Sequence, residues 1–289
     1  MPDPAARDAA EEASALSHPA VVPDATAAYG AHPDQVVDFY APRDGGRSAP
    51  LVVALHGGAW RAPYDRGHLT PFVDFLARRG FAVANVEYRR GGGIPRQGGT
   101  GPVAGRWPET FDDVAAALDA VPDLAAAALP SADPRRIVLT GHSAGGHLAL
   151  WAAARHVLPA GSPWRLPAPP ALRGVVALAP IAHFARAVEL DVCGGAVTEL
   201  LGGAGESAGR FVFADPAALL PTGIATTVVQ GREDTVVPAA VAESYVEAAA
   251  KAGETVGFTL LEDAGHFPLI DPAADACAVV AEEIAQLAW

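Results

Sequence analysis

The chain has 289 residues, of which 51% are apolar, so it is long enough to bury a large core within one domain. Its formal net charge of −13 argues against nucleic acid and anionic membrane surfaces as partners, because both are polyanions. Two cysteines, Cys193 and Cys277, are too few for a disulfide framework, and no uncharged apolar stretch reaches the ~20 residues of a membrane span. The N-terminus lacks a cationic region followed by an apolar run, so we expect no secretory signal and a cytoplasmic location.

Residues 1–25 are rich in alanine, proline and acidic residues and show no apolar periodicity, which predicts a mobile leader. Residues 35–40 predict a first strand, closed by Pro42 and by Gly45-Gly46. From there, short apolar runs alternate with helical patterns. The strand candidates cover residues 51–55, 81–86, 137–140, 175–179, 226–229 and 258–261, and the helix candidates cover residues 67–79, 109–120, 143–157, 239–252 and 273–288.

These strand candidates are rich in β-branched residues without polar alternation, which is typical of parallel strands buried on both faces. Alternating strands and helices predict right-handed crossovers and an α/β fold. We expect one domain over residues 26–289, with a mostly parallel sheet of about eight strands and helices on both faces. Segments near 91–106, 159–172 and 182–222 interrupt the alternation, and we expect lid-like insertions there, on the ligand-binding side of the sheet.

The strongest motif, Gly141-His142-Ser143-Ala144-Gly145, joins a strand candidate directly to a helix candidate. In this context, G-x-S-x-G is the pattern of a nucleophile elbow. The serine takes a strained backbone position, and the residues two before and two after it lie too close to neighbouring chain to carry a side chain. The helix that starts here offers its N-terminal amides and dipole to a developing negative charge. The motif therefore predicts Ser143 as a nucleophile.

A second motif, His56-Gly57-Gly58-Ala59-Trp60, also follows a buried strand candidate. Glycines at such a position let backbone amides point into the site, as in H-G-G motifs that bind an oxyanion. The amides of Gly58, Ala59 and Ala144 are the predicted oxyanion donors. A simple Gly-Gly turn with a core tryptophan is the alternative.

A serine nucleophile needs a base, and the base needs an orienting acid. Asp234 follows the strand candidate at 226–229 and precedes a proline-started helix, where such an acid belongs; Glu233 is its rival. His266 lies on the loop after the last strand candidate and before the C-terminal helix, the expected place for the base. The chain order Ser143, Asp234, His266 thus predicts a catalytic triad.

The remaining candidates are aromatic and histidine side chains near the ends of the strand candidates. We expect a substrate pocket lined by Trp60, Tyr88, Trp107 and His183, although the tryptophans suit the core equally well and His183 suits a structural role. His142 is expected to point away from the nucleophile. The sequence has no ligand spacing such as H-E-x-x-H or C-x-x-C and no dinucleotide fingerprint, so we expect neither a metal nor another cofactor.

With these residues placed, the chain from about Gln35 to its end resembles the α/β-hydrolase superfamily. More closely it is similar to the esterase/lipase group that includes the α/β-hydrolase type of kynurenine formamidase. The resemblance rests on His56–Trp60, Val86–Arg89, Trp107-Pro108, Thr110–Val114, Gly141–Gly146 and Gly265–Pro272. It implies the α/β-hydrolase fold, an oxyanion hole at Gly58 and Ala59, and a triad of Ser143, Asp234 and His266. Hormone-sensitive-lipase-like esterases have a third glycine at the position of Ala59 and favour Asp at the position of His142. Both differences point away from that branch.

The residues and the resemblance together predict a serine hydrolase that cleaves a small to medium carboxylic ester or aryl-formamide through an acyl-enzyme. One alternative is acyl transfer or lactone processing in a biosynthetic pathway, with a nucleophile other than water. Another is a non-catalytic binding module on the same scaffold. The expected partner is a small acyl substrate, and a homodimer is left open.

Overall fold

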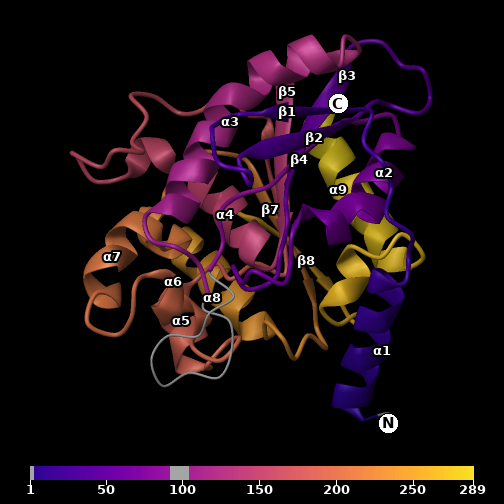
Figure 1. Ribbon diagram of the computed structural model, residues 1–289. Coiled ribbons are helices and arrows are strands. Elements are labelled where there is room, and N and C mark those ends of the chain that lie inside the picture. Colours follow the sequence, from indigo (N-terminus) through magenta and orange to yellow (C-terminus); the bar gives the residue numbers. More distant parts are fainter. Residues whose placement is uncertain (1–2, 92–103) are drawn as a thin grey trace.

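An eight-stranded sheet forms the centre of the computed structural model, which describes residues 3–91 and 104–289 (Figure 1). The strand order is β1-β2-β4-β3-β5-β6-β7-β8. At one edge, β2 pairs antiparallel with both β1 and β4, and all the other neighbouring strands pair parallel. The strands are β1 (Ala25–Ala28), β2 (Val36–Tyr40), β3 (Ala49–Leu55), β4 (Ala82–Val86), β5 (Ala132–His142), β6 (Gly174–Leu178), β7 (Thr226–Gly231) and β8 (Gly257–Leu261).

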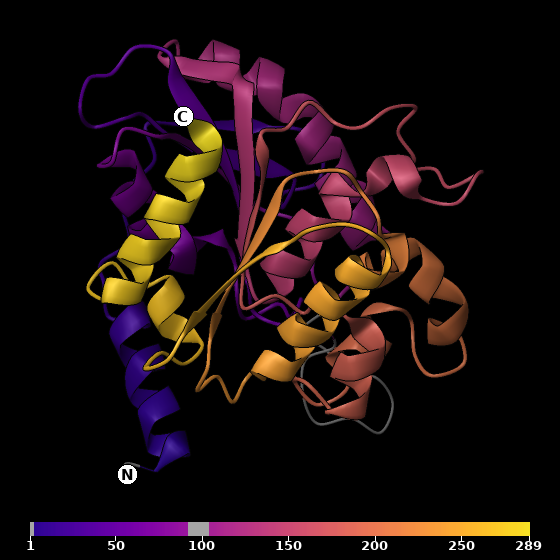
Figure 2. The ribbon, with the colours of Figure 1, turned by 180° about the vertical axis from the view of Figure 1, so that it is seen from behind.

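Helices cover both faces of this sheet (Figure 2). One face carries α2 (Thr70–Ala77) and α9 (Asp275–Ala288), and the other carries α3 (Glu109–Ala128), α4 (Ala144–Ala153) and α8 (Ala239–Lys251). Successive strand residues such as Val52 and Val53 are both fully buried, one in each apolar layer. Burial on both faces is why these strands show no polar alternation. The predicted α/β-hydrolase fold is confirmed.

The N-terminal segment differs from expectation. Instead of a mobile leader, residues 4–16 form the helix α1 (Pro4–Leu16), which lies against the short 3-10 helix η4 (Phe267–Leu269). The segment gave no apolar signal because polar groups hold it: Ser14 Oγ donates to Asp271 Oδ2 at 2.6 Å, and His18 Nε2 lies 2.7 Å from Asp271 Oδ1. These contacts join segments more than 250 positions apart in the sequence.

The segment at 182–222 is largely helical. It contains α5 (Phe184–Glu189), α6 (Ala196–Leu200), α7 (Ser207–Ala214) and the 3-10 helix η3 (Pro216–Leu219). Another 3-10 helix, η1 (Arg66–Leu69), precedes α2, and η2 (Arg155–Val157) follows α4. Most of the expected insertion near 91–106 lies outside the described residues.

The segment at 159–172 is not a lid over the nucleophile. It joins η2 to the beginning of β6 at Gly174, so it lies at the amino edge of the parallel strands. A crossover helix returns the chain to that edge, whereas the loops after β5, β7 and β8 are at the carboxyl edge. The Trp164 side chain anchors the segment by packing on Trp107 and Trp151, with ring centroids 5.2 and 5.7 Å apart.

Candidate active site

The nucleophile elbow lies where β5 ends and α4 begins. Ser143 separates them with a φ of 56° and a ψ of −116°, a strained conformation for a residue with a side chain. A Cβ on Gly141 would stand 2.3 Å from the Gly145 carbonyl oxygen, and one on Gly145 would stand 2.0 Å from the Leu55 carbonyl oxygen. Both positions therefore require glycine, as the motif predicts.

Ser143 and His266 line the same cavity, which has a volume of about 200 Å³ and is called here the Ser143 cavity. Its walls come from the loops after β3, β5, β7 and β8, from α1 and from the segment before α6. The lining residues are Leu16, Gly58, Ala59, Arg61, Tyr64, His68, His142, Ser143, Cys193, Val236, His266, Phe267 and Ile270.

Asp234 and His266 form a buried hydrogen-bonded pair beside this cavity. His266 Nδ1 lies 2.6 Å from Asp234 Oδ2, and both side chains are almost fully buried. The other carboxylate oxygen accepts from the amides of Val236 and Val237 at 2.9 and 2.8 Å. With Nδ1 donating to the carboxylate, the Nε2 of His266 keeps a lone pair for a proton.

The loops that carry this pair touch through their backbones. Glu233 N donates to the Ala264 carbonyl at 3.1 Å, and a Cβ on Gly231 would stand 2.3 Å from the Gly265 carbonyl oxygen. Glycine at position 231 therefore lets the acid loop and the base loop approach each other.

The Ser143 hydroxyl has no hydrogen-bond partner among the described residues, His266 included. The geometry that the structure fixes is the His266–Asp234 pair and the turn at Ser143.

The three backbone amides predicted as oxyanion donors lie near Ser143. Among the described residues, no hydrogen bond uses the amides of Gly58, Ala59 or Ala144. Gly58 and Ala59 line the Ser143 cavity with positive φ values of 104° and 49°, and Ala144 is the first residue of α4. Unused amides beside a nucleophile are what an oxyanion needs.

A buried charge network supports the loop of Gly58 and Ala59. His56 Nε2 lies 2.9 Å from Glu87 Oε1, and Glu87 also pairs with Arg90. Burial raises the pKa of Glu87, but His56 and Arg90 outweigh it and lower the pKa to about 2. Sequence reasoning missed Glu87 as a site residue, since a lone carboxylate after a strand does not reveal that a histidine 31 positions earlier will face it.

The four side chains expected in the substrate pocket lie elsewhere. Trp60 is fully buried against His147, with ring centroids 5.2 Å apart. Tyr88 stacks on the His56 ring and donates to the His56 carbonyl at 2.6 Å.

Trp107 packs on Phe111, with ring centroids 5.1 Å apart, and the His183 ring accepts from the Arg186 amide at the start of α5. Each of the four side chains is thus fixed by packing or by a local hydrogen bond, and none of them lines the Ser143 cavity. Tyr64, His68 and Phe267 supply the aromatic wall instead.

His142 also differs from expectation, because its side chain lies against His266 and lines the Ser143 cavity. Its ring lies 4.3 Å from the His266 ring between centroids, and its Nε2 donates to the His266 carbonyl at 3.0 Å. Burial and the neighbouring His266 lower the pKa of His142 well below its usual range. His142 therefore stays neutral beside the base.

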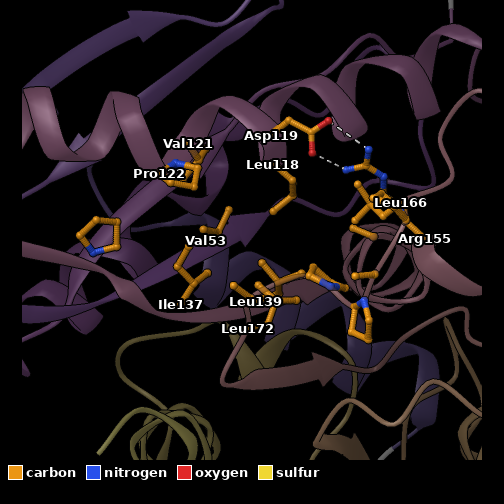
Figure 3. Close-up of a pocket in the computed structure, with 17 residues that line it drawn as sticks. Val53, Leu118, Asp119, Val121, Pro122, Ile137, Leu139, Arg155, Leu166 and Leu172 are labelled. Carbon is orange, nitrogen blue, oxygen red and sulfur yellow. Dashed lines mark hydrogen bonds and ion pairs between the residues drawn. The ribbon is translucent and has the colours of Figure 1, made fainter.

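A larger cavity, of about 460 Å³, lies away from Ser143, between α3 and the segment at 159–172 (Figure 3). Its walls are mostly aliphatic and proline side chains. Arg155 borders it, but the guanidinium is already occupied by Asp119 at 2.7 and 3.0 Å and by the Trp164 carbonyl at 2.9 Å. This cavity therefore presents no free charge for a ligand.

Within residues 3–91 and 104–289, no group of three or more His, Cys, Asp or Glu side chains is arranged to hold a metal ion. In the same part of the chain, no helix is long and apolar enough to cross a bilayer.

A family model described as BD-FAE matches residues 37–248, more than half of the chain. The chain belongs to the BD-FAE family. The BD-FAE match contains Ser143 and Asp234, whereas His266 and α1 lie outside it.

Curated relatives of this BD-FAE chain match over shorter segments. The chain is 35% identical over 106 residues to a probable carboxylic ester hydrolase LipM of Mycobacterium tuberculosis. It is 32% identical over 122 residues to a probable isoprenylcysteine alpha-carbonyl methylesterase of Oryza sativa subsp. japonica. These segments cover 37% and 42% of this chain but only 22% and 26% of the two relatives.

Solved structures similar to this BD-FAE chain match over nearly its whole length. An esterase B from Lactobacillus rhamnosis has a TM-score of 0.74 at 20% identity and covers 98% of this chain and 90% of its own. A truncated carbohydrate esterase from gut microbiota has a TM-score of 0.72 at 18% identity, over 91% of this chain and 96% of its own. At this identity the likeness establishes the fold.

Proposed function

We propose that this BD-FAE protein hydrolyses carboxylic esters with Ser143 as the nucleophile. The observation that carries the proposal is the His266–Asp234 hydrogen bond, 2.6 Å long, at the cavity that holds the strained Ser143. The names of the curated relatives and of the structural neighbours, all esterases, support an ester as the substrate class.

The first half of the reaction acylates the enzyme. Ser143 Oγ attacks the acyl carbon while His266 Nε2 takes the hydroxyl proton, and Asp234 stabilises the resulting imidazolium. The oxyanion accepts from the amides of Gly58, Ala59 and Ala144, each worth ~3 kcal/mol in the transition state. Collapse breaks the bond to the alcohol oxygen, which takes the proton from His266.

The second half frees the enzyme. Water gives a proton to His266 Nε2 and attacks the acyl carbon, and the same amides hold the second oxyanion. Its collapse returns the proton to Ser143 Oγ and releases the carboxylic acid. We therefore propose hydrolysis, with water as the second nucleophile, rather than acyl transfer.

An aryl-formamide is the second candidate substrate. The aromatic rings of Tyr64, His68 and Phe267 in the cavity wall favour it, because they can pack on an aromatic leaving group. Cleavage would use the same groups, with His266 protonating an amine instead of an alcohol.

A direct test combines a panel of p-nitrophenyl acyl esters and N-formylkynurenine with labelling by an organophosphonate. We expect turnover of the esters and one phosphonate on Ser143 by peptide mass spectrometry. Ser143→Ala is expected to lower kcat about 10⁶-fold, since a triad acts as a unit. A folded protein that is neither labelled nor active would contradict the proposal and leave a binding module as the better description. Faster turnover when an alcohol replaces water would instead favour an acyltransferase.

A further inference from the structure

The N-terminal helix α1 is part of the wall of the Ser143 cavity, although it lies outside the segment that matches the BD-FAE model. Its last residue, Leu16, lines the cavity together with Ser143, Phe267 and Ile270, yet remains 43% exposed. A leucine with both properties stands at the mouth of the cavity. Figures 1 and 2 both show α1 continuing below α9, next to the carboxyl edge of the sheet.

The contacts of α1 reach the acid loop. Arg7 Nη2 donates to the Glu233 carbonyl at 3.0 Å and pairs with the Glu233 carboxylate at 3.2 Å. Asp8 accepts from the Thr235 hydroxyl. Glu233 and Thr235 flank Asp234, so α1 is fastened on both sides of the acid.

Other contacts of α1 reach the base loop. Glu11 accepts from the Gly265 amide at 3.2 Å, and Ser14 donates to Asp271 at 2.6 Å. Gly265 immediately precedes His266. The position of Leu16 is therefore fixed relative to Ser143 by the two loops that also fix the acid and the base.

Stability alone gives a weak reason for this attachment. Among the described residues, Arg7 Nε, Asp8 Oδ1 and Glu11 Oε2 are buried without a hydrogen-bond partner, although Arg7 Nε lies 3.9 Å from Glu11 Oε1. An unsatisfied buried polar atom is costly. Of the α1 side chains whose burial the structure describes, only the small Ala15 belongs to the apolar core. The contacts that fasten α1 are polar and partly unsatisfied, and they place an exposed leucine at the cavity mouth. Contact between Leu16 and a ligand explains this arrangement better than stability does.

We propose that Leu16 determines substrate specificity, by contacting the apolar part of an ester that extends from Ser143 to the cavity mouth. This inference rests on the proposed ester hydrolysis. Short esters end before they reach Leu16, whereas longer chains cover it and gain contact area. The favoured substrate class is thus an ester with an aliphatic chain long enough to leave the 200 Å³ cavity.

The test measures kcat/KM for two series, p-nitrophenyl esters of increasing acyl length and acetate esters of increasing alcohol length. In one of the two series, Leu16→Ala is expected to lower kcat/KM for the longer esters about tenfold. Its kcat/KM for p-nitrophenyl acetate should stay within about twofold of the wild-type value. The series that responds identifies the chain that lies on Leu16. Leu16→Trp should shift the preference of that series toward shorter members by narrowing the mouth.

Val188→Ala is the matched control, because Val188 is 45% exposed and does not line the Ser143 cavity. Phosphonate titration gives the fraction of competent sites in each preparation, so a folding defect cannot imitate a change in preference. Equal long-to-short ratios in wild type, Leu16→Ala and Leu16→Trp would overturn this inference while leaving ester hydrolysis intact. Wild-type protein that neither turns over esters nor reacts with the phosphonate would instead contradict the proposed function.

Discussion

His142 lies over His266 and also holds its backbone: the ring centroids are 4.3 Å apart, and His142 Nε2 donates to the His266 carbonyl at 3.0 Å. The residue before Ser143, the proposed nucleophile, is thus tied to His266, its proposed base. Because burial keeps His142 neutral, this tie adds no positive charge that would oppose protonation of His266.

We predict that His142→Phe lowers the free energy of unfolding by about 1–3 kcal/mol, since the buried His266 carbonyl loses its donor. The variant should also lower kcat, because the base loop loses a restraint. Denaturant unfolding and kcat on a short ester measure the two effects. His142→Gln, which keeps a side-chain donor, should lie between wild type and His142→Phe; equal losses in both variants would show that the hydrogen bond is not what matters.

Asp234→Asn is expected to reduce kcat on the order of 10³- to 10⁴-fold, because the amide no longer stabilises the imidazolium or enforces the tautomer with Nδ1–H. Its matched control is Glu233→Gln, a change of the same kind at the adjacent, half-exposed carboxylate that pairs with Arg7. We expect this control to retain kcat within a few fold. A larger loss in Glu233→Gln than in Asp234→Asn would reverse the assignment of the acid.

Glu87→Gln should destabilise the protein by about 3 kcal/mol, because His56 and Arg90 lose a buried anionic partner. We also expect a lower kcat, as the loop of Gly58 and Ala59 loses its support. Glu262→Gln removes an exposed ion pair with Arg232 and should destabilise the protein far less than Glu87→Gln, because solvent screens such a pair. Denaturant unfolding of the two variants side by side checks the contrast, and similar losses would mean that the Glu87 network contributes no more than a surface pair.

Burial lowers the pKa of His147 to about 4, so protonation of this residue opposes folding. Between pH 6.5 and pH 4 the unfolded chain binds a proton at His147 that the folded chain excludes, and stability therefore falls as the pH decreases through this window. The contribution is about 3 kcal/mol over the full range. His147→Gln, which keeps a donor for the Ala214 carbonyl, should show a shallower loss in unfolding experiments across the pH range. An unchanged slope would mean that His147 does not carry the effect.

The sheet was predictable because each buried strand has its own apolar run and most of the helices between strands have their own pattern. The helices between β6 and β7 are the exception, since residues 182–222 were expected only as an insertion. Only β1, Ala25–Ala28, gave no signal, since four small residues at an edge bury little. The elbow was predictable for a steric reason: Gly141 and Gly145 leave no room for a Cβ. Chain order then placed Asp234 and His266 on neighbouring loops. In the structure His266 lines the cavity of Ser143 and Asp234 is hydrogen-bonded to it.

The walls of the site were not predictable, because long-range contacts determine them. Trp60 and Tyr88 follow strands at the carboxyl edge, but which way each ring turns depends on His147 and His56, which belong to other segments. The α1 helix was missed for a related reason. Its alanines favour a helix, but its partners are the loops around residues 233 and 265, which no local pattern reveals.

With Ser143 as the proposed nucleophile, its positive φ of 56° makes catalysis and thermal stability compete at a single position. Glycine there would relieve strain on the order of 1 kcal/mol and would remove the hydroxyl. Screening variants of this protein for heat resistance alone would therefore select variants that have lost the Ser143 hydroxyl. Engineering for thermal stability therefore needs to measure the activity that remains after heating rather than the melting temperature.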